Sequence, residues 1–270
     1  MITSRNANID LVIEDGLAIL TLNRPEVLNA LTRDMVDELR RIADTVEVDP
    51  EIFALAITGA GRAFCSGLDA TLLAASAESG GATAREFPEG EIPGLFVHLL
   101  QCTKPVICAL NGVAAVGGFV LAMMCDLRFA SETASMTAGF SNRGLPAEHG
   151  TSWLLPRLMG ISRSLEFLWG SQKIAATEAL RIGLVDRVVP AGTELAAVKD
   201  YVADLKARVS PRAVAQVKQQ IYGHLDLGFR AAVEDSRVRM MAELKQPDIA
   251  EGARAFIEKR PPHFAPWIGR

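Results

Sequence analysis

Two short apolar runs, each ended by a glycine turn, restrict the fold of this 270-residue chain more than any other feature. Ile52–Thr58 runs into Gly59-Ala60-Gly61, and Val106–Leu110 runs into Asn111-Gly112. An apolar run of this length bounded by glycines is typical of a strand buried in a sheet. Because helical sequence alternates with these strands, we expect an α/β core.

Three further segments predict local structure before the second strand. Residues 9–22 predict a β-hairpin that turns at Asp15-Gly16. Ala74–Gly90 has no sustained period, and we expect a mobile loop or frayed helix that borders a substrate entrance. Thr32 is a candidate N-cap, and the apolar residues after it predict an amphipathic helix: Met35, Leu39, Ile42 and Val46.

The last quarter of the chain differs from the rest. From about Val198 strand patterns disappear, and helical periods continue to Arg260 with breaks at Ser210-Pro211, Gly228 and Pro247. We therefore predict two parts, an α/β core over residues 1–197 and an all-helical domain over residues 198–270.

The charge balance and composition exclude several classes of protein. The chain has 28 Lys and Arg against 32 Asp and Glu, a net charge of −4, which argues against electrostatic binding of nucleic acid. With 49% hydrophobic and 22% charged residues, the composition is that of a globular chain rather than a disordered or fibrous one.

The sequence also predicts a cytoplasmic location. The apolar run Val113–Met124 is interrupted by glycines and ends before Asp126, short of the roughly 20 residues that a membrane span needs. The N-terminus lacks a basic region followed by an apolar stretch, so no secretory signal is expected. The four cysteines lie among apolar neighbours without metal-site spacing, so we expect buried thiols in a reducing compartment: Cys65, Cys102, Cys108 and Cys125.

The first glycine turn does not match the common nucleotide or nucleophile loops. Phe64 stands where the third glycine of a dinucleotide fingerprint would be, and no Gly-Lys-Ser/Thr follows. Ser66 lacks the earlier glycine of a nucleophile elbow. Tight turns between strand and helix explain these glycines without a ligand.

The second glycine turn has a stronger functional implication. A strand runs into Gly117-Gly118 where a helix begins, and exposed amides at that position are donors for an oxyanion. Together with the segment Gly61–Asp69, this pattern resembles the crotonase superfamily, also called the enoyl-CoA hydratase/isomerase family. Three other segments are similar to the family in its order, so the resemblance covers nearly the whole chain: Leu22–Leu31, Glu178–Asp186 and Glu251–Arg260.

The resemblance implies a fold, a substrate class and an assembly. It implies an enzyme built as a spiral of ββα turns with a C-terminal helical domain that forms a homotrimer, often a dimer of trimers. It also implies an acyl-CoA thioester substrate, with coenzyme A as part of the substrate rather than a permanently bound cofactor.

The resemblance assigns an oxyanion hole to two backbone amides. The N–H groups of Leu68 and Gly117 would stabilise the thioester oxygen as it becomes negative during enolate formation. Since both donors are backbone groups, the side chain at position 68 can vary, whereas position 117 is expected to need the close approach that glycine permits.

Proton transfer is where the sequence departs from the family's hydratases. The positions of their two glutamates align with Val120 and Phe140, which cannot transfer protons and would instead line the substrate pocket. Glu148 is the nearest carboxylate and resembles the single acid of some isomerases in the family, and His149 would serve instead or orient it. The alternative is that Glu148 caps a helix or pairs with Arg143 on a surface loop, while His149 makes only a backbone hydrogen bond.

The remaining candidate residues follow from the same resemblance. Ser66, Gly67 and Val27 would contact coenzyme A, while Asp69 is expected to brace the turn rather than to catalyse. Phe256 and Lys259 match positions that reach coenzyme A bound to a neighbouring subunit, although a solvated face of the last helix also explains them. The other histidines lack ligand-type partners at metal spacing, so no metal is expected: His98, His224 and His263.

Three functions remain open at this point. The first is isomerisation or hydration of an enoyl-CoA through an enolate. In the second, the same oxyanion hole serves hydrolysis, decarboxylation or carbon–carbon cleavage, with Glu148 or His149 activating water. The third is an acyl-CoA-binding protein without catalytic activity.

Overall fold

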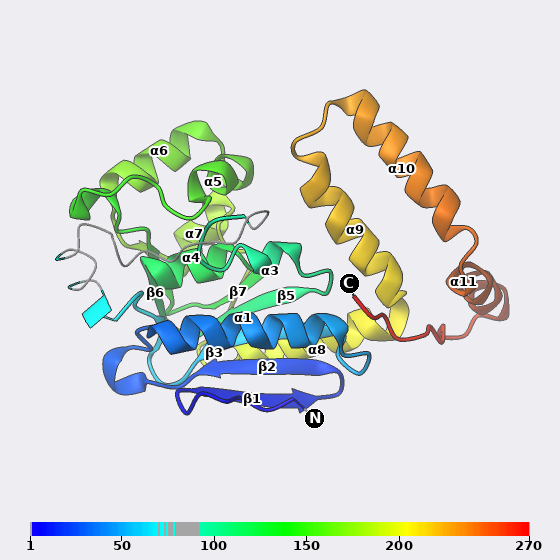
Figure 1. The fold of residues 1–270 in the computed structure, drawn as a ribbon, viewed down its shortest axis with the longest axis horizontal. Coiled ribbons are helices and arrows are strands. Elements are labelled where there is room, and N and C mark those ends of the chain that lie inside the picture. The colour runs from blue at the N-terminus through cyan, green and yellow to red at the C-terminus, as the bar shows by residue number, and fades with distance from the viewer. Residues whose placement is uncertain (1, 70, 73, 75–77, 79–91, 270) are drawn as a thin grey trace.

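The computed structural model describes residues 2–69, 71, 72, 74, 78 and 92–269, and within these residues the strands form two sheets (Figure 1). The larger sheet has the order β1-β2-β3-β5-β7-β10, with strands Ile9–Glu14, Leu17–Leu22, Ala54–Gly59, Val106–Leu110, Leu127–Ser131 and Arg187–Val189. The smaller sheet has the order β4-β6-β8-β9, with strands Ala63–Cys65, Val113–Ala115, Ser135–Thr137 and Ile174–Ala175.

Successive strands alternate between the two sheets. β3, β5 and β7 lie parallel in the larger sheet, and the strand after each of them, β4, β6 or β8, lies parallel in the smaller one. Each turn of the chain thus adds one strand to each sheet, which is a spiral of repeated units. The predicted hairpin is confirmed, since β1 pairs antiparallel with β2 across Asp15 and Gly16, whose φ angles are 50° and 85°.

Helices cover both faces of the larger sheet and form the end of the chain. The predicted helix after Thr32 is confirmed as α1, and the Thr32 hydroxyl caps it by accepting from the Met35 amide at 3.2 Å. The α-helices that lie wholly within the described residues are α1 (Arg33–Val48), α3 (His98–Gln101), α4 (Gly117–Met123), α5 (Thr151–Met159), α6 (Ile161–Gly170), α7 (Ala176–Ile182), α8 (Glu194–Arg208), α9 (Pro211–His224), α10 (Phe229–Glu243) and α11 (Pro247–Glu258).

Alternation along the strands builds a core on each face of the larger sheet. On β5, Cys108 belongs to the cluster that includes side chains of α1 and α4, while the adjacent Ile107 belongs to the cluster under α8. Val198 and Val202 of α8 are buried in that second cluster. The predicted boundary between residues 197 and 198 falls inside α8, so the first helix of the expected helical domain packs on the sheet.

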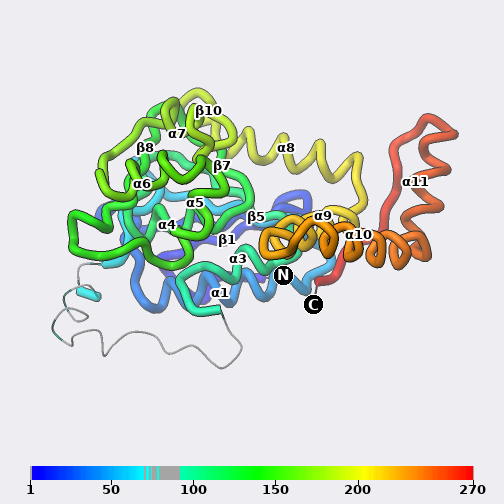
Figure 2. Tube along the Cα trace, turned by 90° about the horizontal axis from the view of Figure 1, so that it is seen from above, coloured from blue at the N-terminus to red at the C-terminus, as the bar shows by residue number. Residues whose placement is uncertain are grey.

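The helices after α8 extend away from the sheets (Figures 1 and 2). The predicted breaks at Ser210-Pro211, Gly228 and Pro247 are confirmed, because α9, α10 and α11 begin there. α9 is tied to the core through Asp126, which accepts from the Lys218 ammonium at 2.7 Å and from the Tyr222 hydroxyl at 3.0 Å.

Three further predictions concern the cysteines, membrane-spanning helices and the segment Ala74–Gly90. All four cysteines are free and buried, as expected. Across the described part of the chain, no helix is long and apolar enough to cross a membrane. Most of Ala74–Gly90, expected to be a mobile loop or frayed helix, lies outside the described residues.

Candidate active site

Two segments distant in the sequence lie against each other at one end of the larger sheet. The loop after β2 contacts the turn after β3 through Asn29, which is fully buried. Its side-chain amide donates to the carbonyls of Ala60 and Ala63, and its Oδ1 accepts from the Arg24 amide at 2.9 Å. Asn29 itself has a φ of 57°, in a region that asparagine adopts more readily than most residues.

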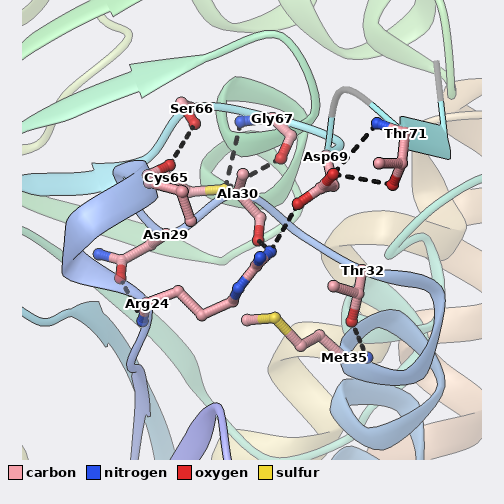
Figure 3. A network of polar contacts seen from close by, with 11 residues as sticks. Arg24, Asn29, Ala30, Thr32, Met35, Cys65, Ser66, Gly67, Asp69 and Thr71 are labelled. Atoms are coloured by element: carbon pink, nitrogen blue, oxygen red, sulfur yellow. Dashed lines mark hydrogen bonds and ion pairs between the residues drawn. The ribbon is translucent and has the colours of Figure 1, made fainter. Parts of the chain in front are cut away.

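Asp69 braces this pair of segments (Figure 3). Arg24 donates from one nitrogen, Nη1, to Asp69 at 2.8 Å and to the Ala30 carbonyl at 2.7 Å. The other carboxylate oxygen of Asp69 accepts from the Thr71 amide and hydroxyl. The hydrogen bond from Arg24 lowers the pKa of Asp69 to about 2, so this residue is a fixed anion. Its bonds are those of the structural brace that the sequence predicts.

The candidate contacts for coenzyme A lie on the edge of the same turn. Ser66 donates from its amide to the Leu28 carbonyl at 3.0 Å and from its hydroxyl to the Val27 carbonyl at 3.3 Å. Val27 is 39% exposed, and Gly67 has a φ of 109°, which favours glycine. The structure therefore brings Val27, Ser66 and Gly67 together beside the brace, while their contact with coenzyme A stays a prediction.

The two amides assigned to an oxyanion hole are neighbours. A methyl group added at Gly117 would lie 3.5 Å from the Leu68 nitrogen, and one added at Gly67 would lie 3.2 Å from the Gly117 nitrogen. Gly117 is the first residue of α4, where an N–H has no partner within the helix. Within the described residues, neither the Leu68 nor the Gly117 N–H donates a hydrogen bond to the protein. Two unused backbone donors are thus held side by side.

Close approach is required at Gly118 rather than at Gly117. A Cβ at Gly118 would lie 2.2 Å from the Cys65 carbonyl oxygen, whereas a Cβ at Gly117 would make only ordinary contacts at 3.5 Å. The expectation that position 117 needs glycine for close approach therefore finds no support in the surrounding protein atoms. Gly118 instead lets α4 begin directly on β4, which sets the distance between the two amides.

Val116 is a feature of this site that the sequence analysis missed. It precedes the Gly117 amide with a φ of 51° and a ψ of −113°, a conformation that β-branched residues rarely adopt. Its ψ angle orients the peptide that carries the Gly117 N–H. Its amide donates to the Thr137 carbonyl at 3.1 Å, and its Cβ would lie 3.2 Å from a methyl added at Gly67. A β-branched residue gives no sequence signal for such a turn.

The two positions that the resemblance aligns with the hydratase glutamates are apolar and enclosed. Val120 on α4 is 0% exposed and Phe140 is 1% exposed, both in the cluster against which Leu68 and Val116 pack. These side chains can neither move protons nor hold a water between two carboxylates. Neither position therefore carries an acid, and both place buried apolar side chains in the cluster that contacts Leu68 and Val116.

Glu148 lies in the loop before α5. Its carboxylate has no hydrogen-bond or ion-pair partner among the described residues. Its backbone carbonyl accepts from the Thr151 amide and hydroxyl, while Arg143, considered as an ion-pair partner, donates to the Gly139 carbonyl. The alternative interpretation, in which Glu148 pairs with Arg143, is therefore wrong. Partial burial raises the pKa of Glu148 above its usual value, because desolvation disfavours the charged form. A carboxyl group whose pKa is raised in this way is a candidate for proton exchange.

His149 is held by a single backbone hydrogen bond. The Leu95 amide donates to its Nδ1 at 3.2 Å, and burial lowers the pKa of the imidazole. The next residue, Gly150, lies near Met124 at the end of α4, since a methyl there would be 3.9 Å from the Met124 Cε. The loop that carries Glu148 and His149 thus lies against α4, the helix that begins at the Gly117 amide.

Other chemistries find little support around the amides. Burial raises the pKa of the Cys65 thiol to about 12, so it is not a nucleophile at neutral pH. Among the residues that the structure describes, no group of three or more His, Cys, Asp or Glu side chains is arranged to hold a metal ion.

Phe256 and Lys259 lie far from these residues. They belong to the end of α11, on the arm that projects away from α4 and β6 (Figures 1 and 2). Phe256 is 86% exposed and Lys259 is exposed. Within one chain they do not join the candidate site, so any contact with coenzyme A would be to another copy.

A spiral of strands that brings two backbone amides together at a glycine-rich helix start defines a protein of the crotonase fold. The model of the enoyl-CoA hydratase/isomerase family matches residues 12–266, so the chain belongs to that family and is an enzyme of it. A probable enoyl-CoA hydratase of Rhodobacter capsulatus is 38% identical over 255 residues, which cover 93% of this chain and 95% of that protein.

Two further relatives differ in their named activities. A 1,2-epoxyphenylacetyl-CoA isomerase of Escherichia coli is 32% identical over 263 residues, covering 93% of this chain and 96% of that protein. The crystal structure of an enoyl-CoA hydratase from Polaromonas sp. JS666 superimposes with a TM-score of 0.86 at 30% identity, covering 95% of this chain and 99% of that one. Similar overall structure therefore accompanies both hydratase and isomerase names, and the reaction must be argued from the site.

Proposed function

We propose that this enzyme acts on an acyl-CoA thioester through an enolate whose oxygen is stabilised by the amides of Leu68 and Gly117. The observation that carries the proposal is the adjacency of these two unused donors at the start of α4. A thioester oxygen placed between them gains charge when the α-carbon loses a proton. Coenzyme A is part of the substrate in this proposal and not a resident cofactor.

Glu148 is the proposed group that moves the proton. A single carboxylate with a raised pKa takes a proton from one carbon of the acyl chain and returns it to another, which is isomerisation of a double bond. Val120 and Phe140 support this reaction over two-glutamate hydration because neither side chain can replace a hydratase acid.

Wild type and Glu148→Gln are compared by mass spectrometry on 2-enoyl-, 3-enoyl- and dienoyl-CoA thioesters. Loss of the base is expected to lower kcat by roughly 10²- to 10⁴-fold while binding of the thioester persists. Equal turnover by both proteins would show that Glu148 is not the base and would favour hydrolysis, decarboxylation or carbon–carbon cleavage through other groups. Binding without turnover by wild type would instead indicate an acyl-CoA-binding protein.

We also propose that the chain assembles as a homotrimer or a dimer of trimers. α10 has no buried residue, yet it carries exposed apolar side chains, and α11 adds more: Phe229, Val233, Val238, Met240 and Met241, then Ile249, Phe256 and Ile257. A helix pair with this much exposed apolar surface is incomplete without a partner. Light scattering is expected to give three or six times the chain mass, and a monomer would contradict the proposal.

The cytoplasmic location expected from the sequence stays a prediction. Fractionation of cells that express the protein, with the chain followed by antibody, would test it directly.

A further inference from the structure

We infer that His149 is a fixed hydrogen-bond donor to an oxygen atom on the acyl chain of the substrate, and not a base. The inference deepens the proposed function and rests on it, because it assumes that a thioester occupies the site. It starts from the contact between two loops, in which the Leu95 amide donates to His149 Nδ1 at 3.2 Å. A methyl added at the neighbouring Gly94 would lie 3.5 Å from the His149 Cα, so the two loops are in close contact.

The hydrogen bond from Leu95 determines which ring nitrogen carries the proton. A neutral imidazole has one N–H donor and one acceptor nitrogen. Because Nδ1 accepts from a backbone N–H, the proton is on Nε2. Protonation of Nδ1 would place two N–H groups against each other, and burial of the ring also opposes the cation. His149 therefore presents an N–H at Nε2 and has no free lone pair to act as a base.

The Nε2–H needs an acceptor that the protein does not supply. Among the described residues, no acceptor receives a hydrogen bond from Nε2, and the Glu148 carboxylate next to it in sequence does not pair with it. From the facing loop, Leu95 contacts the ring through an N–H that already donates to Nδ1 and so provides no acceptor to Nε2. In the free enzyme water satisfies this donor, and a bound substrate that displaces the water must replace its hydrogen bond.

The acceptor is an oxygen other than that of the thioester. The thioester oxygen has the Leu68 and Gly117 amides as its donors, and these lie at the start of α4, whereas the loop of His149 contacts the end of that helix near Met124. The Nε2–H donor of His149 is thus displaced along α4 from the two amides. It suits a second oxygen on the acyl chain, such as that of a hydroxyl, carbonyl or epoxide group. A site built to bind such an oxygen discriminates against an acyl chain that lacks it.

Two substitutions separate the roles of the two ring nitrogens. His149→Asn keeps an acceptor oxygen near the position of Nδ1, so the bond from Leu95 can persist while the donor at Nε2 is lost. His149→Gln places an amide N–H near the position of Nε2 and gives up the acceptor for Leu95. In wild type, ¹⁵N NMR of the imidazole is expected to show a protonated Nε2 and an unprotonated Nδ1 near neutral pH. The opposite tautomer would overturn the inference without any assay of activity.

Binding of matched thioesters then tests the donor role. Butyryl-CoA, 3-hydroxybutyryl-CoA and 4-hydroxybutyryl-CoA are titrated calorimetrically into wild type and both variants. Wild type is expected to bind at least one hydroxylated thioester roughly threefold to tenfold more tightly than butyryl-CoA, the gain of one hydrogen bond. His149→Asn should lose this preference and His149→Gln should keep it.

The possible failures are distinguishable. Equal affinity of wild type for all three thioesters, or a preference that survives in His149→Asn, would overturn the donor role while leaving the proposed function intact. No binding of any thioester by wild type would overturn the proposed function itself. A preference lost equally in both variants would assign His149 to holding the loop through Leu95 and would also overturn the inference.

Discussion

The two halves of the candidate site are built in different ways. The amide half consists of backbone groups fixed by buried elements, since α4 begins directly on β4 at Gly118 and the segment that carries Leu68 is braced by Arg24 and Asp69. The loop half consists of the side chains of Glu148 and His149 on the loop before α5, where His149 accepts the hydrogen bond from the Leu95 amide. The first half cannot change without disturbing the core, whereas the second can change its chemistry by substitution.

This difference explains how one fold accommodates relatives with different named reactions. Stabilisation of a thioester oxygen needs only two N–H groups, which every residue except proline provides. The position and pKa of the acid depend instead on individual side chains and their burial. The reaction is therefore expected to follow the loop before α5 rather than the spiral of strands.

The largest effect is expected from breaking the amide half at Gly118. In Gly118→Ala the new Cβ would lie 2.2 Å from the Cys65 carbonyl oxygen, which belongs to a buried strand and cannot move freely. We expect a loss of about 3 kcal/mol in the free energy of unfolding, together with loss of turnover. Thermal denaturation is expected to show a Tm lower by roughly 10 °C.

A matched control for that substitution exists on α9. Gly223 lies inside this helix with open space where a Cβ would be, so Gly223→Ala is expected to leave stability unchanged or raise it by about 0.5–1 kcal/mol. If the two substitutions have the same effect, the tight contact between α4 and β4 does not hold the amides.

A smaller effect is expected at Val116, where the amide half stores strain. In a helix or strand, glycine normally makes the folded protein less stable than alanine does, by about 0.5–1 kcal/mol. At a φ of 51° this order should reverse, so Val116→Gly is expected to be more stable than Val116→Ala by about 1 kcal/mol. Both variants should lose kcat because the peptide carrying the Gly117 N–H is less firmly held.

Urea denaturation of both Val116 variants, with assays on the same thioester, provides the measurement. The usual order, with alanine more stable, would show that the strained conformation relaxes. Unchanged kcat in Val116→Gly would show that the orientation of the Gly117 peptide does not depend on this side chain.

The amide half, which is made of backbone groups, was easier to predict from the sequence than the half made of loop side chains. The hairpin, the strands β3 and β5 with their glycine turns, and the breaks before α9, α10 and α11 were predictable because period and turn residues are local properties. The adjacency of Leu68 and Gly117 also followed from the resemblance, since both lie in glycine turns. Their role as oxyanion donors stays a prediction.

The loop half was less predictable. Leu95 is 54 positions from His149, and a backbone amide that donates to a histidine has no sequence signature. The Glu148 carboxylate does not pair with Arg143, and its pKa is raised. Both properties depend on the burial of the loop, which a local sequence pattern does not predict. The positive φ of Val116 is also set by its contacts and not by its residue type.

The smallest effect is expected from the charge of Glu148 on stability. Its folded-state pKa is raised, so between the unfolded and folded pKa values the native protein binds more protons than the unfolded chain. Stability is therefore lost as the pH rises through the window between the unfolded and folded values, and the desolvation penalty of the charged form is complete at neutral pH. Glu148→Gln removes that penalty, so the variant should be more stable than wild type at pH 7, by less than about 4 °C in Tm.

The test is to measure the Tm of wild type and of Glu148→Gln between pH 4 and pH 8. The difference between Glu148→Gln and wild type should shrink toward pH 4, where the wild-type carboxyl is neutral as well. A more stable but less active variant would show that burial of this loop carboxylate is maintained for chemistry at a cost in stability. A variant that is less stable than wild type at pH 7 would mean that the charged carboxylate has a stabilising partner, and Glu148 would then belong to the structural brace of the site rather than to its proton transfer.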